Sequence, residues 1–113
     1  MQQLLVIALA VTFFAVFWYL KRPTISPAAA HALVAEGATL VDVRTPSEFV
    51  LRHLDGARNI PVGEIAQRTA EIMPSDRPVV IYCASGARSA LAARALKRAG
   101  FTRVYNLGAI SNW

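Results

Sequence analysis

The fold is decided by the stretch Val79-Val80-Ile81-Tyr82-Cys83-Ala84-Ser85-Gly86-Ala87-Arg88-Ser89. Its apolar and partly β-branched beginning predicts a buried strand over Pro78–Cys83. The segment after the loop, Ser89–Ala99, is rich in alanine and leucine and predicts a helix that Gly100 ends. A short loop therefore joins the end of a buried strand to the beginning of a helix, and ligands bind at such positions in α/β proteins.

Cys83 is the only cysteine of the chain, and it lies at the end of this strand. Backbone N–H groups and the positive end of the helix dipole converge on the loop, so a cysteine there is expected to be a thiolate more often than a free thiol is. The alternative is a buried cysteine that packs as a small apolar side chain. We take Cys83 as the candidate nucleophile, with a substrate-binding loop that consists of Ala84, Ser85, Gly86, Ala87, Arg88 and Ser89.

A long apolar segment near the N-terminus predicts a membrane-spanning helix. Residues 4–20 read LLVIALAVTFFAVFWYL and contain no charged side chain. About 20 helical residues match a hydrocarbon core of about 30 Å. The pair Trp18-Tyr19 lies where aromatic rings favour the lipid headgroups, and Lys21-Arg22 follows at once. We therefore expect a membrane anchor over residues 1–22 and a separate domain over residues 23–113.

Two alternatives to a retained anchor are a cleaved signal peptide and a buried core helix. A signal peptide begins with basic residues and ends at small ones. Here Met1-Gln2-Gln3 carries no charged side chain, and Ala28-Ala29-Ala30 lies beyond the basic pair. By the positive-inside rule, Lys21-Arg22 places the domain on the cytoplasmic side and the N-terminus outside, which in a bacterium means the inner membrane.

The composition limits the classes of function. The chain has 113 residues, a formal net charge of +5 and a sequence pI near 10.2. The roughly 90 residues after the anchor suffice for one small domain. No basic stripe interleaved with aromatic residues indicates nucleic-acid binding, so we attribute the charge to an anionic membrane surface and an anionic substrate. A single cysteine excludes an intramolecular disulfide, a Cys-x-x-Cys redox pair and a cysteine zinc cluster, and we expect no metal or other cofactor.

Strands and helices alternate along the whole domain. The other expected strands are Thr39–Arg44, Ala57–Pro61 and Arg103–Leu107, and the other expected helices are Ala28–Glu36, Pro46–Leu51 and Glu64–Met73. The sequence Thr45-Pro46-Ser47-Glu48 is a capping box, which predicts the beginning of a helix. This alternation predicts an α/β fold with a mainly parallel sheet and helices on both faces.

Asp42 and Arg44 lie at the end of the first expected strand. Because ligands bind beyond the carboxyl ends of parallel strands, we include both as substrate-binding candidates that orient the loop or the entrance to it. The alternative is a structural network with Glu48 or the neighbouring backbone. Arg88 has two interpretations of the same kind, since it can face an anionic donor or form a structural pair with a carboxylate.

The order of these segments resembles that of rhodanese-like domains. Leu40–Phe49 resembles their DVR-x-P-x-E-F/Y segment, His53–Pro61 their GHI-x-GA-x-NIP segment, Cys83–Ser89 their C-x-x-G-x-R-S loop, and Gly100–Gly108 with Trp113 their ending. Ala109 stands where the family usually has a second glycine. The resemblance extends from about Thr24 to Trp113, which is nearly the whole domain.

The resemblance implies a parallel sheet of about five strands with helices on both faces, preceded here by the transmembrane helix. It also implies that Cys83 attacks the sulfane sulfur of a small anionic donor such as thiosulfate and becomes a persulfide. A thiophilic acceptor, cyanide or another thiol, then takes the sulfur. The N–H groups of the loop would stabilise the thiolate and the persulfide, and Gly86 would allow a positive φ. The expected activity is that of a thiosulfate sulfurtransferase.

Two other functions share this fold and loop. Phosphatases and arsenate reductases with a Cys-x-x-x-x-x-Arg signature wrap a tetrahedral oxyanion, whereas Cys83–Arg88 is one residue shorter and favours a smaller sulfur site. The other alternative is a membrane-tethered rhodanese-like module that binds a protein partner or senses persulfide without turnover.

Overall fold

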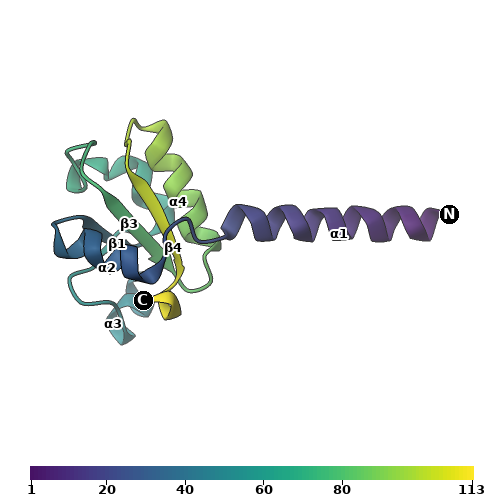
Figure 1. Cartoon of the computed structure of the whole chain (residues 1–113), viewed down its shortest axis with the longest axis horizontal. Coiled ribbons are helices and arrows are strands. Elements are labelled where there is room, and N and C mark those ends of the chain that lie inside the picture. The colour runs from purple at the N-terminus through teal and green to yellow at the C-terminus, as the bar shows by residue number, and fades with distance from the viewer.

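Helix α1 (Gln2–Lys21) projects away from the rest of the chain (Figure 1). The structure is a computed structural model that describes residues 1–113, and its longest extent, 54 Å, runs along the direction of this helix. No residue of α1 is buried. The helix is apolar on all sides, which distinguishes it from the amphipathic helices of soluble domains. By length and composition α1 is suited to span a membrane, and a signal sequence shares these properties.

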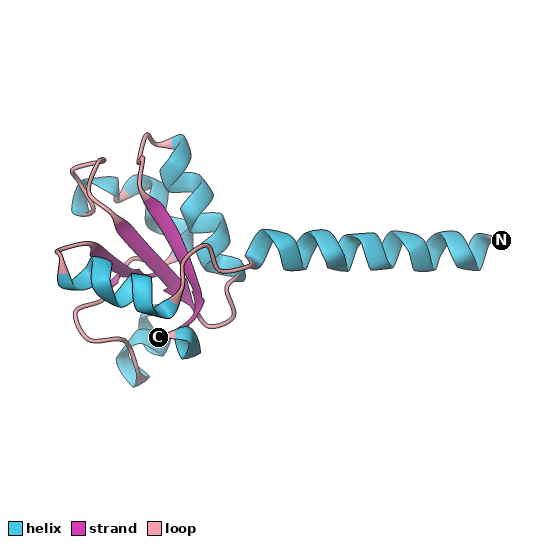
Figure 2. Ribbon diagram, viewed as in Figure 1, coloured by secondary structure: helices cyan, strands magenta, loops and turns pink.

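A four-stranded parallel sheet forms the centre of the domain (Figure 2). Its strands are β1 (Thr39–Asp42), β2 (Arg58–Asn59), β3 (Val79–Cys83) and β4 (Val104–Ala109), in the order β2-β1-β3-β4. Val41 of β1 lies opposite Ile81 of β3, and Ile81 lies opposite Asn106 of β4. Strand β3 is therefore interior to the sheet, and all five of its residues are buried.

The sheet is flanked by α-helices and short 3₁₀ turns. These elements are α2 (Pro27–Ala35), α3 (Pro46–Leu51), η1 (Val62–Gln67), η2 (Thr69–Glu71), α4 (Ala87–Arg98) and η3 (Ile110–Asn112). The predicted caps are confirmed. The Ser26 hydroxyl accepts a hydrogen bond from the Ala29 N–H, and Thr45 and Glu48 form a complete capping box.

Helices cover both faces of the sheet, as the alternation of elements predicts. Val79, Ile81 and Cys83 belong to a core cluster that includes residues of α4 and η1. Val80 and Tyr82 belong to a second cluster that includes residues of α2. This division follows from the two-residue period of a strand, and it places the Cys83 side chain on the face that α4 covers.

The expectation of a helix over Glu64–Met73 is wrong. The segment forms the two 3₁₀ turns η1 and η2, separated at Arg68, whose φ of −117° and ψ of 25° lie outside the helical region. Ile65 and Ile72 both enter the core. β-Branched residues such as isoleucine have a low helix propensity. The backbone here therefore follows the conformation that buries both isoleucine side chains, and it does not form a regular α-helix.

The expected parallel α/β fold is confirmed, and its sheet has four strands, one fewer than the five or so that the resemblance implies. One further segment reaches the free edge of β4, where the Thr24 N–H donates to the Asn106 carbonyl at 2.8 Å. The Asn106 N–H donates to the Thr24 hydroxyl instead of to a backbone carbonyl. The contact is this one backbone hydrogen bond, and it does not continue as a ladder.

Candidate active site

Cys83 ends β3 beneath the loop that leads into α4. Its thiol is fully buried. The Gly86 N–H donates a hydrogen bond to Sγ at 3.0 Å, and the Cys83 thiol donates to the Ser89 Oγ at 3.4 Å. The Ser89 hydroxyl is also 3.1 Å from the Gly86 carbonyl and can donate to it. The sulfur therefore lies inside a closed turn, and once the thiol loses its proton the Ser89 hydroxyl can turn to donate to it.

The turn depends on the backbone of Gly86. Its φ is +101°, a region that side-chain-bearing residues rarely adopt, and it precedes the first residue of α4. A Cβ at Gly86 would lie 2.9 Å from the carbonyl oxygen of Lys21. The prediction of a positive φ at this glycine is confirmed. The helix begins at Ala87, two residues earlier than predicted, so the loop itself forms the first turn of α4.

The environment of Cys83 lowers the pKa of its thiol. Burial is the largest single influence and raises the pKa. Hydrogen bonds from the Ser89 hydroxyl and from the backbone N–H groups of Ser89, Gly86 and Ser85 lower it, and together they outweigh burial. The loop therefore stabilises a negative charge on sulfur, which is the nucleophilic form of cysteine.

Accessibility differs among the loop residues. Ala84 and Ser85 are exposed, whereas Gly86 and Ser89 are buried with Cys83. Because Cys83 has no accessible surface, a reactant reaches Sγ only after a small displacement of the loop. The exposed pair Ala84-Ser85 is the part of the loop with fewest restraints from packing.

Arg88 forms a two-point ion pair with Glu48. Its Nη1 and Nη2 donate to the two carboxylate oxygens at 2.7 and 3.0 Å, and about a third of each side chain is exposed. The hydrogen bond from Arg88, aided by the Thr45 N–H, lowers the pKa of Glu48 to about 2. The pKa of Arg88 is raised mainly by Glu48, and the charge of Cys83 adds to this effect. The guanidinium is thus a positive group that both Glu48 and the thiolate attract.

Asp42 and Arg44 bind each other at the end of β1. Both are buried, and the Asp42 carboxylate accepts hydrogen bonds from the Arg44 N–H, Nε and Nη2, the last at 2.7 Å. Arg44 Nη2 also donates to the carbonyl of Arg52, just after α3. The Tyr82 ring lies 5.7 Å from the Arg44 guanidinium, and the Tyr82 hydroxyl accepts from the Leu54 N–H. The geometry is that of a structural network that ties β1, β3 and the end of α3 together.

The sequence did not single out Glu48 and Ser89 for the roles they have in the structure. The sequence places Glu48 in the capping box and offers it as a network partner of Asp42 and Arg44, whereas in the structure it pairs with Arg88, 40 residues further along the chain. The loop motif predicts a backbone N–H from Ser89, and in the structure its hydroxyl is in addition close to Sγ. A polar residue in the first turn of the helix that follows a nucleophile is the sequence signal for this second contact.

Comparison with known proteins indicates one family. The family described as Rhodanese-like domain matches residues 26–113. The Bacillus subtilis protein YqhL is 47% identical over 77 residues, which cover 67% of this chain and 60% of YqhL. A protein named Sulfurtransferase from Allochromatium vinosum is 47% identical over 79 residues, 69% of this chain and 73% of the relative. Thiosulfate sulfurtransferase PspE of Escherichia coli is 36% identical over 73 residues, 64% of this chain and 70% of PspE.

Solved structures have the same fold. The human single-domain sulfurtransferase TSTD1 superposes with a TM-score of 0.68 at 26% identity, and the match covers 81% of this chain and 92% of TSTD1. A rhodanese with anions from E. coli superposes with a TM-score of 0.66 at 31% identity, covering 68% of this chain and 92% of the other.

Proposed function

The chain belongs to the rhodanese-like domain family, and from that premise we propose that it is a sulfurtransferase that carries sulfur as a persulfide on Cys83. Relatives named sulfurtransferase and thiosulfate sulfurtransferase support sulfur transfer in general. The observation that carries the proposal is the enclosure of a single thiol by the Gly86 N–H and the Ser89 hydroxyl at the junction of β3 and α4. This arrangement lowers the pKa of the thiol and leaves one nucleophile for the chemistry.

In the first step the Cys83 thiolate attacks the outer sulfur of a small anionic donor, for which thiosulfate is the simplest choice. A new S–S bond forms, the bond between the two donor sulfurs breaks, and sulfite leaves with the electron pair. The product is a Cys83 persulfide with its negative charge on the terminal sulfur. No oxidant is required, because the outer sulfur of the donor already has the oxidation state that it has in the persulfide.

In the second step an acceptor, cyanide or a thiolate, attacks the terminal sulfur. The bond between the two sulfurs of the persulfide breaks, and the Cys83 thiolate is regenerated as the leaving group. Both steps therefore need stabilisation of an anionic sulfur in the loop. Backbone N–H groups at the beginning of α4 supply it, and the Gly86 N–H already donates to Sγ.

The loop residues Ala84–Ser89 form the proposed binding site for the donor, with Arg88 as its positive side chain. Two nitrogens of Arg88 bind Glu48, which fixes the guanidinium and leaves its Nε–H for the sulfonate end of a donor. Asp42 and Arg44 support this site indirectly, because their network holds the end of β1 beside β3.

We further propose that residues 1–22 are a membrane anchor and that residues 23–113 are the catalytic domain on the cytoplasmic side. The helix α1, which carries no charged side chain before Lys21, and the basic pair Lys21-Arg22 support this topology. The Lys21 ammonium lies 4.2 Å from the centre of the Trp18 ring, an arrangement suited to the lipid headgroup region. Resistance of the full chain to carbonate extraction from membranes is the expected result, and release as a shortened soluble chain would identify a signal sequence instead.

The decisive experiment measures the intact mass of the full chain in detergent micelles before and after thiosulfate, with Cys83→Ser as the control. We expect a gain of one sulfur atom on the wild type only, which cyanide then removes. A folded wild type that gains no sulfur but recovers a partner protein would favour a binding module. Hydrolysis of a phosphate ester in excess of sulfur transfer would favour a phosphatase.

A further inference from the structure

The junction between α1 and α4 contains a basic pocket that the proposed sulfur chemistry does not use. Its volume is about 200 Å³, and it lies between the last turn of α1 and the middle of α4. Three of its lining residues are positively charged, namely Arg22, Arg94 and Lys97, and no carboxylate lines it. Arg94 and Lys97 are three residues apart on α4 and therefore share one face of that helix.

These three positive charges have no ion-pair partner in the structure. The carboxylates that form ion pairs are Asp42, Glu48, Glu64 and Glu71, and each binds an arginine elsewhere in the domain. The guanidinium of Arg22 is held against the ring of Tyr19 at 4.5 Å. Uncompensated like charges around one cavity create a local positive potential, which an anion would relieve.

An apolar groove of about 190 Å³ lies beside the basic pocket. Phe17, Leu20 and Leu91 line it, and Leu91 is 57% exposed although it is a large apolar side chain. Leu20 and Arg94 line both the groove and the pocket, so the two are adjacent. Phe17 is one turn closer to the middle of α1 than Lys21 is, so the groove runs in the direction of the apolar helix.

We propose that this junction binds one anionic phospholipid, with its phosphate at Arg22, Arg94 and Lys97 and an acyl chain along Phe17 and Leu91. The inference rests on the proposal that α1 spans a membrane. A free anion would fill the pocket but would leave the neighbouring groove empty, whereas a phospholipid matches a positive pocket and an apolar groove at once. The location at the end of α1 is also the depth at which headgroups lie.

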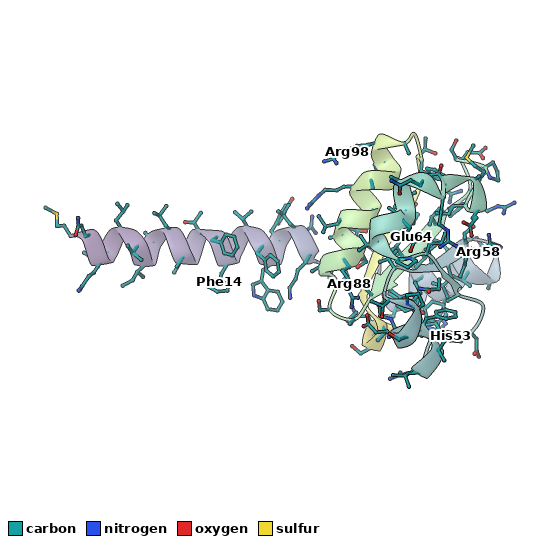
Figure 3. The ribbon with its side chains drawn as sticks, turned by 180° about the vertical axis from the view of Figure 1, so that it is seen from behind. Phe14, His53, Arg58, Glu64, Arg88 and Arg98 are labelled. Atoms are coloured by element: carbon teal, nitrogen blue, oxygen red, sulfur yellow. The ribbon has the colours of Figure 1, made fainter.

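The lipid would fix the orientation of the catalytic domain. Figure 3 shows Arg88 at the end of α4 near α1 and Arg98 at the far end, while Phe14 lies along α1 outside the domain. A phosphate held between α1 and the middle of α4 would therefore secure the half of α4 that begins with the Cys83 loop at the membrane surface.

The test uses the full chain in detergent micelles, titrated with phosphatidylglycerol or phosphatidylcholine and observed by native mass spectrometry. We expect one phosphatidylglycerol bound in preference to phosphatidylcholine. In Arg94→Gln/Lys97→Gln the affinity should fall about thirtyfold, since each basic residue near an anionic lipid contributes about fivefold. The matched control is Arg77→Gln/Arg103→Gln, which removes the same charge from exposed positions that do not line the pocket and should leave the affinity unchanged.

Three results would overturn the inference. The first is equal binding of the two lipids, and the second is an equal loss of affinity in both double variants. The third is displacement of phosphatidylglycerol by inorganic phosphate at the same concentration as the lipid. The last result would assign the pocket to a free anion. Carbonate extraction is the separate readout for the anchor, and the gain of sulfur from thiosulfate is the separate readout for the chemistry. An embedded, active chain that binds both lipids alike would therefore refute only the lipid site.

Discussion

The carbonyl oxygen of Lys21 lies over Gly86, so that a Cβ built on this glycine would be 2.9 Å from it. The last residue of the apolar helix thus contacts the residue whose N–H binds the sulfur of Cys83. The end of α1 therefore packs against the loop at this point, and the conformation of the loop and the position of α1 depend on each other.

Gly86→Ala should therefore destabilise the domain for two reasons. A positive φ costs a side-chain-bearing residue about 1 to 2 kcal/mol, and the new methyl group must also displace the Lys21 carbonyl. Gly37→Ala is the matched control, because Gly37 has a φ of +105° but no atom within 4 Å of its Cβ position. Chemical denaturation should give a larger loss for Gly86→Ala than for Gly37→Ala. An equal loss in free energy of unfolding in the two variants would show that the contact with Lys21 does not affect stability.

Ser89→Ala should raise the pKa of Cys83. The Ser89 hydroxyl is the strongest of the hydrogen-bonding groups that lower this pKa, and its removal leaves burial, which raises the pKa, less opposed. The pH dependence of alkylation by a small iodoacetamide-type reagent measures the shift. The midpoint should move to higher pH in the variant, and the rate near neutral pH should fall because less thiolate is present.

Ser85→Ala is the control for this experiment, since Ser85 acts on Cys83 through its backbone N–H, which alanine retains.

A lowered thiol pKa also makes the stability of the domain depend on pH. The contribution of the thiolate is complete above the pKa of the unfolded thiol and is lost as the pH falls through the lower folded value. A stability profile that is the same in wild type and Ser89→Ala would contradict the assigned hydrogen bond.

The parts of the fold that local rules decide were predictable. Thr45 and Glu48 form the expected capping box because its hydrogen bonds join residues three apart. The strand at Val79–Cys83 follows from its unbroken apolar pattern, and the loop after it follows from Gly86. The family motifs then indicate Cys83 as the proposed nucleophile within this framework.

The parts that depend on distant contacts were not predictable. Nothing in a local pattern pairs Glu48 with Arg88, because the two are 40 residues apart and meet only when α3 and α4 are in place. The same holds for the 3₁₀ turns at Ile65 and Ile72, whose burial overrides the helical pattern. The strand number is a further case: the segment at Thr24 makes one backbone hydrogen bond to Asn106 of β4 without extending the sheet, and the motifs do not encode this.

Glu48→Gln should separate the contribution of the ion pair to stability from that of the helix cap. Glutamine serves equally well in a capping box, so the variant loses chiefly the charge that Arg88 binds. Both side chains are about a third exposed, and the loss should be only about 0.5 to 1 kcal/mol near neutral pH. Glu36→Gln, at a carboxylate that forms no ion pair, is the control for a simple change of net charge.

The effect of the pair on stability should depend on pH in a known direction. The pKa of Glu48 is lowered to about 2, so the stabilisation is complete above its ordinary pKa, near 4.5, and disappears as the pH falls toward 2. The difference in free energy of unfolding between wild type and Glu48→Gln should shrink over this interval. A difference that persists unchanged at the lower end would show that Glu48 stabilises the domain without its charge.

Arg88→Lys, which loses the two-point geometry, should weaken use of thiosulfate more than use of an uncharged persulfide donor.

Asp42→Asn should distinguish a structural network from a substrate-binding role. Asp42 is the buried partner of Arg44, and the variant would leave a buried guanidinium without its counter-charge, which typically costs about 3 to 5 kcal/mol. The double variant Asp42→Asn/Arg44→Leu removes that charge as well and should recover part of the lost free energy of unfolding. If the pair acts through structure alone, the KM for thiosulfate of the folded fraction should stay near the wild-type value. A raised KM in a variant that keeps its stability would instead place Asp42 in contact with the donor.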